Sequence, residues 1–413
     1  MLASDIRLIS AGTQCELQAQ VKSDVARKRF LLRYVFPRQV ESFLTPENGD
    51  PFLAGLLLPA MITGESLEIR APVSSKLLHS VHELQTIYRS WSPKFSVVQV
   101  RADVRKIQQP EINRGRGTGL FFSCGVDSYY SLLTRTGKRL QDEEAITDLI
   151  VGYGQDLLYE KRNSNVFSKL LMNANNVAKR LGLRTLPVAT NLRDFSDRYT
   201  EFKWSHGAAL ASIGLTLETL FKKIYIASSS NYAKLVPWGS HPKLDPLWST
   251  ECLSFVHDIS DTNRLDKIRF VSRFPLVQET LRVCSIHSYS PRFYNCGSCE
   301  KCVRTMIALW ISGALSKCTT LPHYIDLALV LNHNFYREDC EEFFNALGSS
   351  REELAIRSAL EESISTATRS KVKRHLFQAM NDQVLVYFPF LVAARDKMLR
   401  AFTKRKYPLM VPA

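Results

Sequence analysis

The chain has 413 residues, with 54 lysines and arginines against 40 aspartates and glutamates, which gives a formal net charge of +14. Hydrophobic residues make up 45% and charged residues 23%, which excludes a disordered or fibrous chain, and the length predicts two or three globular domains. The longest apolar runs, Phe52–Ile62 and Val384–Ala394, are shorter than the ~20 residues that a membrane-spanning helix needs. Asp5 and Arg7 lie where a signal peptide has its apolar core, so we expect a cytoplasmic protein without a membrane partner.

The positive charge and the nine cysteines leave the partner and the chemistry open. A basic chain indicates an anionic partner, which can be a nucleic acid, a nucleotide or an acidic protein. Structural disulfides are not expected in the cytoplasm because that compartment is reducing. Metal binding or thiol chemistry is therefore the expected use of the cysteines.

Residues 1–108 are predicted to form a mixed α+β domain. Short runs of β-forming residues indicate an antiparallel meander, and two longer apolar segments have the spacing of helices. The basic, glycine-bearing stretch 109–118 is the expected boundary to the next domain. The expected strands are Ile6–Ile9, Cys15–Val21, Arg29–Val35 and Phe95–Val100, and the expected helices are Pro51–Ile62 and Val73–Tyr88.

Residues 117–318 follow a regular succession of strand, loop and helix. This alternation predicts an α/β domain in which helical crossovers join the strands of a parallel sheet. Residues 319–413 are charged and have a helical pattern, so they form a third expected segment. The strands are expected at Gly119–Phe122, Ile146–Tyr153, Leu186–Thr190 and Ile224–Ser228, and the helices at Tyr129–Thr134, Asn165–Leu181 (capped by Gly182) and Gly207–Phe221.

The small-residue loop Ser123–Ser128 follows the first strand of the α/β part and opens a helix. Such a turn presents successive backbone N–H groups beside the positive end of a helix, which suits a phosphate group. Ser123 and Ser128 add hydroxyl groups. The spacing and the lysine of the nucleoside-triphosphatase P-loop are absent. An ordinary strand–helix turn is the alternative interpretation.

Four cysteines, spaced Cys-x11-Cys-x2-Cys-x2-Cys, form the sharpest motif in the sequence. Four sulfur ligands predict a closed, structural Zn²⁺ site. An iron–sulfur cluster is the alternative, but its usual run has a further cysteine after three intervening residues, often followed by proline, whereas Arg304 and Thr305 follow the last cysteine here. His287 lies inside the loop and could replace one cysteine. The predicted metal ligands are Cys284, Cys296, Cys299 and Cys302.

These motifs carry a resemblance to a known family. The segment Ser123–Ser128 resembles the PP-loop, Ser-Gly-Gly-x-Asp-Ser, of the N-type ATP pyrophosphatases. The loop and the cysteine motif together, with Arg304 after it, resemble the 7-cyano-7-deazaguanine synthases of the queuosine pathway over residues 117–315. The resemblance implies a parallel-sheet nucleotide-binding core with a zinc knuckle, to which an N-terminal α+β domain and a C-terminal helical region are added.

The resemblance also implies the chemistry: ATP, with Mg²⁺, adenylates a carboxylate, an amine forms the amide, and a second ATP drives dehydration to a nitrile. The family places its zinc site next to the active-site pocket. Asp127 is expected to position the metal and Ser128 to bind phosphate, as catalytic residues. The expected ATP-binding set is Ser123, Cys124, Gly125, Val126, Asp127 and Ser128.

Cys124 departs from the family pattern because it replaces the first glycine of the PP-loop. If this position requires a positive φ, a side chain there costs about 1 kcal/mol or more. We also expect that the thiol would crowd the phosphates.

Polar residues after the later strands are candidates for substrate binding. His206 and Gly207 form a pair that also occurs in the deazaguanine synthases, although a helix cap explains the pair as well. The loop Trp238–Asp245 has the composition of a binding loop. The candidate substrate residues are His206, Ser229, Asn231, Lys243 and Asp245.

We therefore predict an ATP-dependent carbon–nitrogen ligase that acts on a small carboxylate of the deazaguanine type. Queuosine-precursor synthesis is one version. The other version follows from residues 1–105 and 319–413, which have no counterpart in the housekeeping enzyme and resemble the enlarged synthase-like proteins of bacterial antiviral defence operons. There, the deazaguanine product would be attached to a partner protein.

Two other classes of function remain open at this point. A PP-loop enzyme that transfers sulfur or an amine to tRNA would use the basic charge to bind RNA. It would need a reactive cysteine pair, yet Cys252, Cys318 and Cys340 form no Cys-x-x-Cys motif. A non-catalytic ATP-binding regulator is the third class, for which Cys124 is the argument. Nucleic acid is therefore the less favoured partner.

Overall fold

The computed structural model describes residues 1–25, 27–105, 115–136, 145–160, 163–258, 261–284, 293–335, 337–381 and 410–412. His287, most of the predicted 109–118 boundary and the run Val384–Ala394 lie outside these residues. The chain divides into two compact units, Met1–Thr262 and Asn263–Ala413. No helix in the described part of the chain is long and apolar enough to cross a bilayer.

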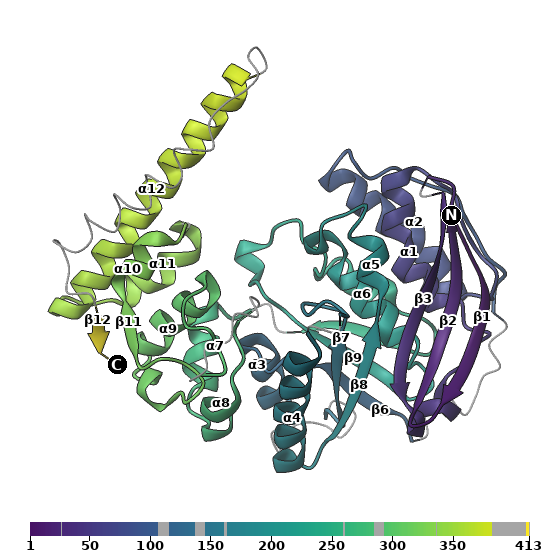
Figure 1. Cartoon of the computed structure of the whole chain (residues 1–413), viewed down its shortest axis with the longest axis horizontal. Helices are drawn as coiled ribbons and strands as arrows, with labels where there is room; N and C mark the ends of the chain where they lie inside the picture. Colours follow the sequence, from purple (N-terminus) through teal and green to yellow (C-terminus); the bar gives the residue numbers. More distant parts are fainter. Residues whose placement is uncertain are drawn as a thin grey trace. The chain divides into compact units, whose positions relative to one another are not determined.

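The first unit contains one ten-stranded sheet with the order β10-β9-β6-β7-β8-β3-β2-β1-β4-β5 (Figure 1). Most neighbouring strands are parallel, which confirms the predicted α/β class with a large, mainly parallel sheet. The strands are β1 (Leu2–Ala11), β2 (Gln14–Ser23), β3 (Lys28–Pro37), β4 (Leu67–Ile69), β5 (Val100–Arg101), β6 (Gly117–Phe121), β7 (Asp148–Tyr153), β8 (Arg184–Thr190), β9 (Phe221–Ala227) and β10 (Ser254–Asp258).

The strand β6 lies at the centre of the parallel part and is buried along its whole length. It pairs in parallel with β7 on one side and with β9 on the other. The chain therefore runs outward from β6 through β7 to β8, and then crosses to β9 and β10 on the opposite side of β6. In a sheet of this kind, ligands bind beyond the carboxyl ends of the strands, where the strand order reverses. That point lies between β6 and β9.

Helices cover both faces of this sheet (Figure 1). The helices α3 (Val126–Thr134) and α4 (Ser164–Leu181) lie on one face. Four helices lie on the other face: α1 (Asp50–Thr63), α2 (Ser75–Trp91), α5 (Leu192–Ser196) and α6 (Phe202–Leu215). Gly182 ends α4 with a left-handed φ of 70°, as predicted for a C-cap. The helix expected at Gly207–Phe221 starts and ends earlier, because Phe221 already belongs to β9.

The N-terminal strands are continuous with the parallel part in one sheet, so the expected boundary at 109–118 joins two parts of that sheet. The strand β3 pairs antiparallel with β8, and the Asn191 side chain accepts from Arg33 N–H (2.8 Å) and donates to the Leu31 carbonyl (2.8 Å). Arg105 binds Asp50 (2.9 Å) and Glu218, and burial raises the pKa of Asp50 to about 7. These contacts join the first hundred residues to the parallel strands.

The strand predicted at Phe95–Val100 is wrong, since only Val100–Arg101 forms a strand, β5. The backbone of this segment finds other partners. Val98 exchanges two hydrogen bonds with the side-chain amide of Gln85 on α2, and Ser96 N–H donates to the Met61 carbonyl at the end of α1. The segment therefore packs against helices instead of completing a strand.

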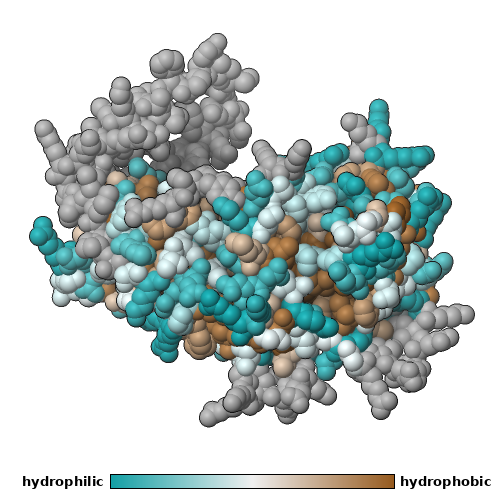
Figure 2. All heavy atoms as spheres, turned by 60° about the horizontal axis from the view of Figure 1, so that its bottom comes forward, coloured by the Kyte–Doolittle hydropathy of each residue, from teal (hydrophilic) through white to brown (hydrophobic). Residues whose placement is uncertain are grey.

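The face of the sheet that carries α4 has an apolar groove of about 490 Å³. Aromatic and aliphatic side chains line most of it, including Tyr153, Phe167, Phe36 and Pro187. The rings of Tyr153 and Phe167 stack with their centroids 4.5 Å apart. Apolar surface is also prominent on the first unit in the view of Figure 2.

The second unit is mainly helical. Its helices are α7 (Arg264–Val271), α8 (Pro275–Thr280), α9 (Glu300–Ile311), α10 (Leu327–Asn332), α11 (Arg337–Ala346) and α12 (Arg351–Asn381). The segment 319–413, predicted as helical, also contains a two-stranded antiparallel sheet of β11 (Tyr324–Asp326) and β12 (Met410–Pro412). Three-residue strands carry too little periodicity to be recognised in the sequence.

Candidate nucleotide and metal sites

The predicted phosphate loop connects β6 to α3 in the first unit. Gly125 N–H donates to the Ser123 hydroxyl (3.3 Å), and the Ser128 hydroxyl donates to the Gly125 carbonyl (3.0 Å), so the two serines close the turn. The helix α3 starts at Val126, and its N-cap residue Gly125 provides no side-chain cap for the first turn. Asp127 lies half-buried in that turn. Uncapped N–H groups at the positive end of a helix form an anion site.

Cys124 has a left-handed backbone with φ 56° and is fully buried. Residue 124 therefore does require a positive φ. A residue with a Cβ is destabilised by about 1–2 kcal/mol in this region of φ. Since the thiol is buried, it does not lie on the exposed side of the loop with Ser123. The thiol in this position is therefore not expected to crowd phosphates bound on the exposed side of the loop.

The loop after β9 lies beside the phosphate loop. Leu120 of β6 pairs with Tyr225 of β9, and continuation of this register places Ser123 level with Ser228. Ser229 is exposed, and the Asn231 Oδ1 atom is buried without a hydrogen-bond partner in the described part of the chain. Two of the predicted substrate residues thus follow the strand that borders the reversal point of the sheet.

Gln155 is a further polar residue at this edge. It follows β7 at its carboxyl end, and only 6% of the residue is exposed. Neither atom of its side-chain amide has a hydrogen-bond partner among the residues that the structure describes. A buried amide without partners costs about 1–3 kcal/mol, so a ligand that pairs with it would regain that free energy.

His206 has both ring nitrogens engaged within the protein. The Ser240 N–H donates to its Nε2 (3.1 Å), so Nδ1 carries the proton that faces the Phe202 and Lys203 carbonyls (3.3 and 3.2 Å). Burial lowers the pKa of His206, which favours this neutral form. His206 therefore anchors the loop 238–245 to α6.

Gly207 allows that loop to approach the helix. A Cβ atom on Gly207 would lie only 2.0 Å from the Gly239 carbonyl oxygen. In the pair His206-Gly207, the histidine side chain thus binds the loop, and the absence of a Cβ on the glycine leaves room for the loop backbone. Lys243, from the same loop, is exposed.

Asp245 is completely buried at the start of η4 (Asp245–Trp248), where three donors surround it. The Ser240 hydroxyl donates to its Oδ2 (2.6 Å), and the His257 Nδ1–H donates to the same oxygen (2.7 Å). The His241 N–H donates to Oδ1 (3.4 Å). His257 was missed in the sequence because β10 was not recognised; only its pairing with β9 brings His257 to this loop.

The four cysteines of the second unit converge as predicted. Their Sγ atoms all lie within 4.8 Å of one another. The Cys296–Cys302 and Cys284–Cys299 sulfur pairs are 3.7 and 3.9 Å apart. Sulfurs at about 2.3 Å from a tetrahedral zinc are about 3.8 Å apart, so the cluster has the geometry for one metal ion such as zinc.

The surroundings of the sulfurs also fit a cation. The Cys299 N–H donates to the Cys296 Sγ (3.3 Å), a bond that stabilises a thiolate ligand. Hydrogen bonding with Cys284 raises the pKa values of Cys299 and Cys302, and the shared protons lower that of Cys284. A divalent cation that binds the thiolates would displace the protons that Cys299 and Cys302 share with Cys284.

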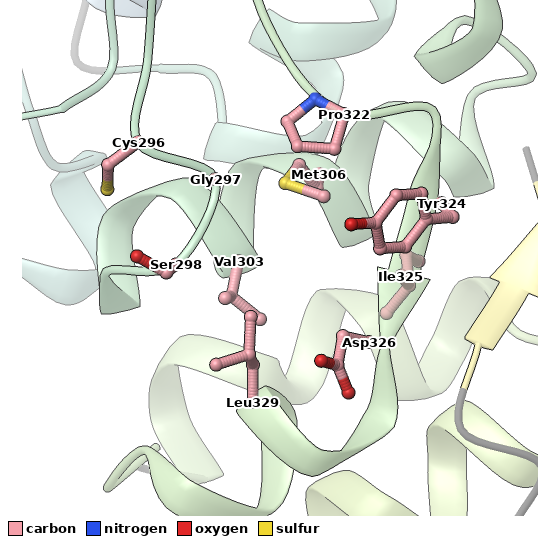
Figure 3. A pocket seen from close by; sticks show the side chains of 10 residues that line it. All are labelled: Cys296, Gly297, Ser298, Val303, Met306, Pro322, Tyr324, Ile325, Asp326 and Leu329. Carbon is pink, nitrogen blue, oxygen red and sulfur yellow. The ribbon is translucent and has the colours of Figure 1, made fainter. Parts of the chain in front are cut away.

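A pocket of about 120 Å³ borders the cluster (Figure 3). Val303, Met306 and Leu329 give it apolar walls, and the sulfur of Cys296 points away from it. This direction of the sulfur agrees with a structural metal site whose four positions are filled by protein.

Comparisons of the chain with family models, with curated proteins and with solved structures give no match. The function must therefore be argued from the residues and from their geometry.

We predict that the purified chain contains one zinc ion, and that Cys302→Ala loses most of it because three ligands hold zinc more weakly than four. Elemental analysis gives the metal content, and a thermal melt with a chelator gives its contribution to stability. Cys318→Ala is the matched control, since Cys318 is a buried cysteine of the same unit outside the cluster. Iron with sulfide in the preparation would contradict the zinc assignment.

The backbone of the phosphate loop can be tested with two variants that both remove the Cys124 thiol. We expect Cys124→Gly to be more stable than Cys124→Ala by about 1 kcal/mol, because only glycine adopts a positive φ without cost. Urea unfolding of both variants measures this difference. Equal stabilities would show that residue 124 is not held in the left-handed region.

Proposed function

We propose that the chain is a PP-loop enzyme of the 7-cyano-7-deazaguanine synthase type, which uses ATP to adenylate a carboxylate and then forms a carbon–nitrogen bond. The observation that carries this proposal is the place of the loop Ser123–Ser128. It follows the central strand β6, directly at the reversal of strand order between β6 and β9, and it opens the uncapped helix α3. Nucleotide phosphates bind at such a point.

The residues around the loop have complementary roles in the proposed reaction. The N–H groups of the first turn of α3 and the hydroxyls of Ser123 and Ser128 would hold the pyrophosphate part of ATP. Asp127 would hold Mg²⁺, which supplies positive charge against the departing pyrophosphate. Gln155, at the end of the neighbouring strand β7, offers an unpaired amide to the adenine base. The attacking carboxylate needs no base because it is ionised at neutral pH.

The state of the cysteines argues against sulfur transfer to tRNA. Sulfur transfer requires an accessible thiolate. Burial raises the pKa of Cys15, Cys252 and Cys318, and Cys124 and Cys340 are buried. The other four cysteines belong to the metal cluster.

The proposal also specifies the chemical group that reacts with the activated carboxylate. The acceptor of the activated carboxylate is an amine, which is ammonia in the simple version and an amine of a partner protein in the defence-related version. A low-molecular-weight amide or nitrile product, formed without any added protein, identifies the simple version.

We expect the protein to release AMP and pyrophosphate when it is incubated with ATP, Mg²⁺ and 7-carboxy-7-deazaguanine. Asp127→Asn should lower this release by about 100-fold or more, since the metal contributes several kcal/mol to charge stabilisation. Chromatography of the nucleotides measures both rates. Asp103→Asn, on an exposed residue of the same unit, is the matched control. Tight ATP binding without turnover in the presence of candidate acceptors would instead identify a regulator.

Gln155→Leu separates nucleotide recognition from stability. We expect ATP affinity to fall by about 5- to 10-fold, because a hydrogen-bonded amide contributes about 1–1.5 kcal/mol. The free energy of unfolding should stay the same or rise, since the variant buries no unpaired amide. Calorimetric titration and a thermal melt measure the two quantities. Unchanged ATP affinity would show that Gln155 does not contact the nucleotide.

A further inference from the structure

The His257–Asp245 pair has the geometry of a base with its orienting carboxylate. The His257 Nδ1 lies 2.7 Å from the Asp245 Oδ2, and Asp245 is completely buried. Since Nδ1–H donates to this carboxylate, the neutral ring carries its lone pair on Nε2. The carboxylate also offers a counter-charge to the ring when Nε2 takes up a proton.

The Nε2 atom of His257 makes no hydrogen bond with any described residue. The ring lines a small pocket of about 10 Å³, together with Ser228–Ser230, Trp238 and His241. This volume is at the lower limit for one water molecule. Ammonia, or the nitrogen of a primary amine, has the same size as that water.

The constellation is not a serine-nucleophile triad. The Ser240 hydroxyl donates to Asp245 Oδ2 (2.6 Å), and it lies on the Nδ1 side of His257 (3.4 Å). In a triad, the serine faces the other ring nitrogen, Nε2. Ser240 therefore supports the carboxylate, and the free nitrogen of His257 serves a group that comes from outside.

The sheet places this space within reach of the phosphate loop. His257 lies on β10, next to β9, and β9 lies next to β6, from which the phosphate loop starts. Two strand spacings of about 4.8 Å separate β10 from β6, or about 10 Å in all. With the pyrophosphate at α3, the single phosphate of the adenylate and the acyl carbon bonded to it would together span a comparable distance.

We infer that His257 is the general base of the amide-forming half of the reaction, and that Asp245 is its positioning residue. This inference rests on the proposed adenylation. The amine nitrogen attacks the acyl carbon, a C–N bond forms, and the C–O bond to AMP breaks with its electron pair leaving on AMP. The proton lost by the amine passes to His257 Nε2, and the Asp245 carboxylate stabilises the resulting cation.

The test compares wild type with His257→Gln, whose side-chain amide is polar but cannot act as a base. Two steps are measured: ATP–pyrophosphate exchange with 7-carboxy-7-deazaguanine, and single-turnover amide formation with ammonium chloride. We expect exchange within about twofold of wild type, and amide formation slowed by about 100-fold or more. Hydroxylamine, a stronger nucleophile than ammonia, should restore part of the product formation because its attack depends less on a base. His82→Gln, on an exposed residue of α2, is the matched control.

Each outcome decides between the two proposals. If wild type shows no exchange, the adenylation and the base assignment both fall. If exchange occurs and His257→Gln forms amide at the wild-type rate, only the base assignment is wrong. Loss of exchange in His257→Gln would show that the residue builds the site and does not act as the base.

Asp245→Asn tests the positioning role. It should lower the rate constant of amide formation at saturating substrate while the KM for ATP stays within about twofold, because the base is disordered and the nucleotide site is intact. A parallel loss of ATP affinity would show that Asp245 only supports the fold. The thermal melt of each variant confirms that the protein compared is folded.

Discussion

The parallel pairing of β6 with strands on both of its sides is the constraint on which the rest of the first unit depends. Because β7 and β9 both run in the direction of β6, their carboxyl ends meet at one edge of the sheet. Polar groups from distant parts of the sequence therefore meet at that edge through the strand order alone. They are the loop Ser123–Ser128, Gln155 and the serines after β9. Polar groups can stay unpaired there because a parallel sheet leaves this edge to ligands.

The N-terminal hundred residues are part of this architecture and not an appendage. Asn191, just beyond β8, satisfies the backbone of the neighbouring N-terminal strand, and Arg105 joins Asp50 to Glu218 near the start of β9. Removing one partner from a buried ion pair costs far more than the pair contributes. The N-terminal strands therefore cannot be separated cleanly from the strands that carry the site.

Features that depend on neighbouring residues could be predicted from the sequence. Features that depend on tertiary contacts could not. Apolar strands, the Gly182 cap and the four-cysteine geometry follow from short-range patterns, and the structure has all of them. Phe95–Val100 has the composition of a strand, but the Gln85 amide and the end of α1 take its backbone groups. His257 gave no signal because its role depends on pairing between β9 and β10. The sequence shows that Cys124 replaces a glycine, but it does not show whether the backbone at this position has a positive φ.

The buried position of Cys124 has a consequence for how the phosphate loop can be observed. Water-borne oxidants and alkylating reagents attack a thiolate that they can touch, and here the sulfur is sealed beneath the turn that precedes α3. The reaction of this one thiol must wait until the loop opens. Its rate therefore reports how often the loop comes away from the sheet, and a bound ligand that holds the loop shut would slow it.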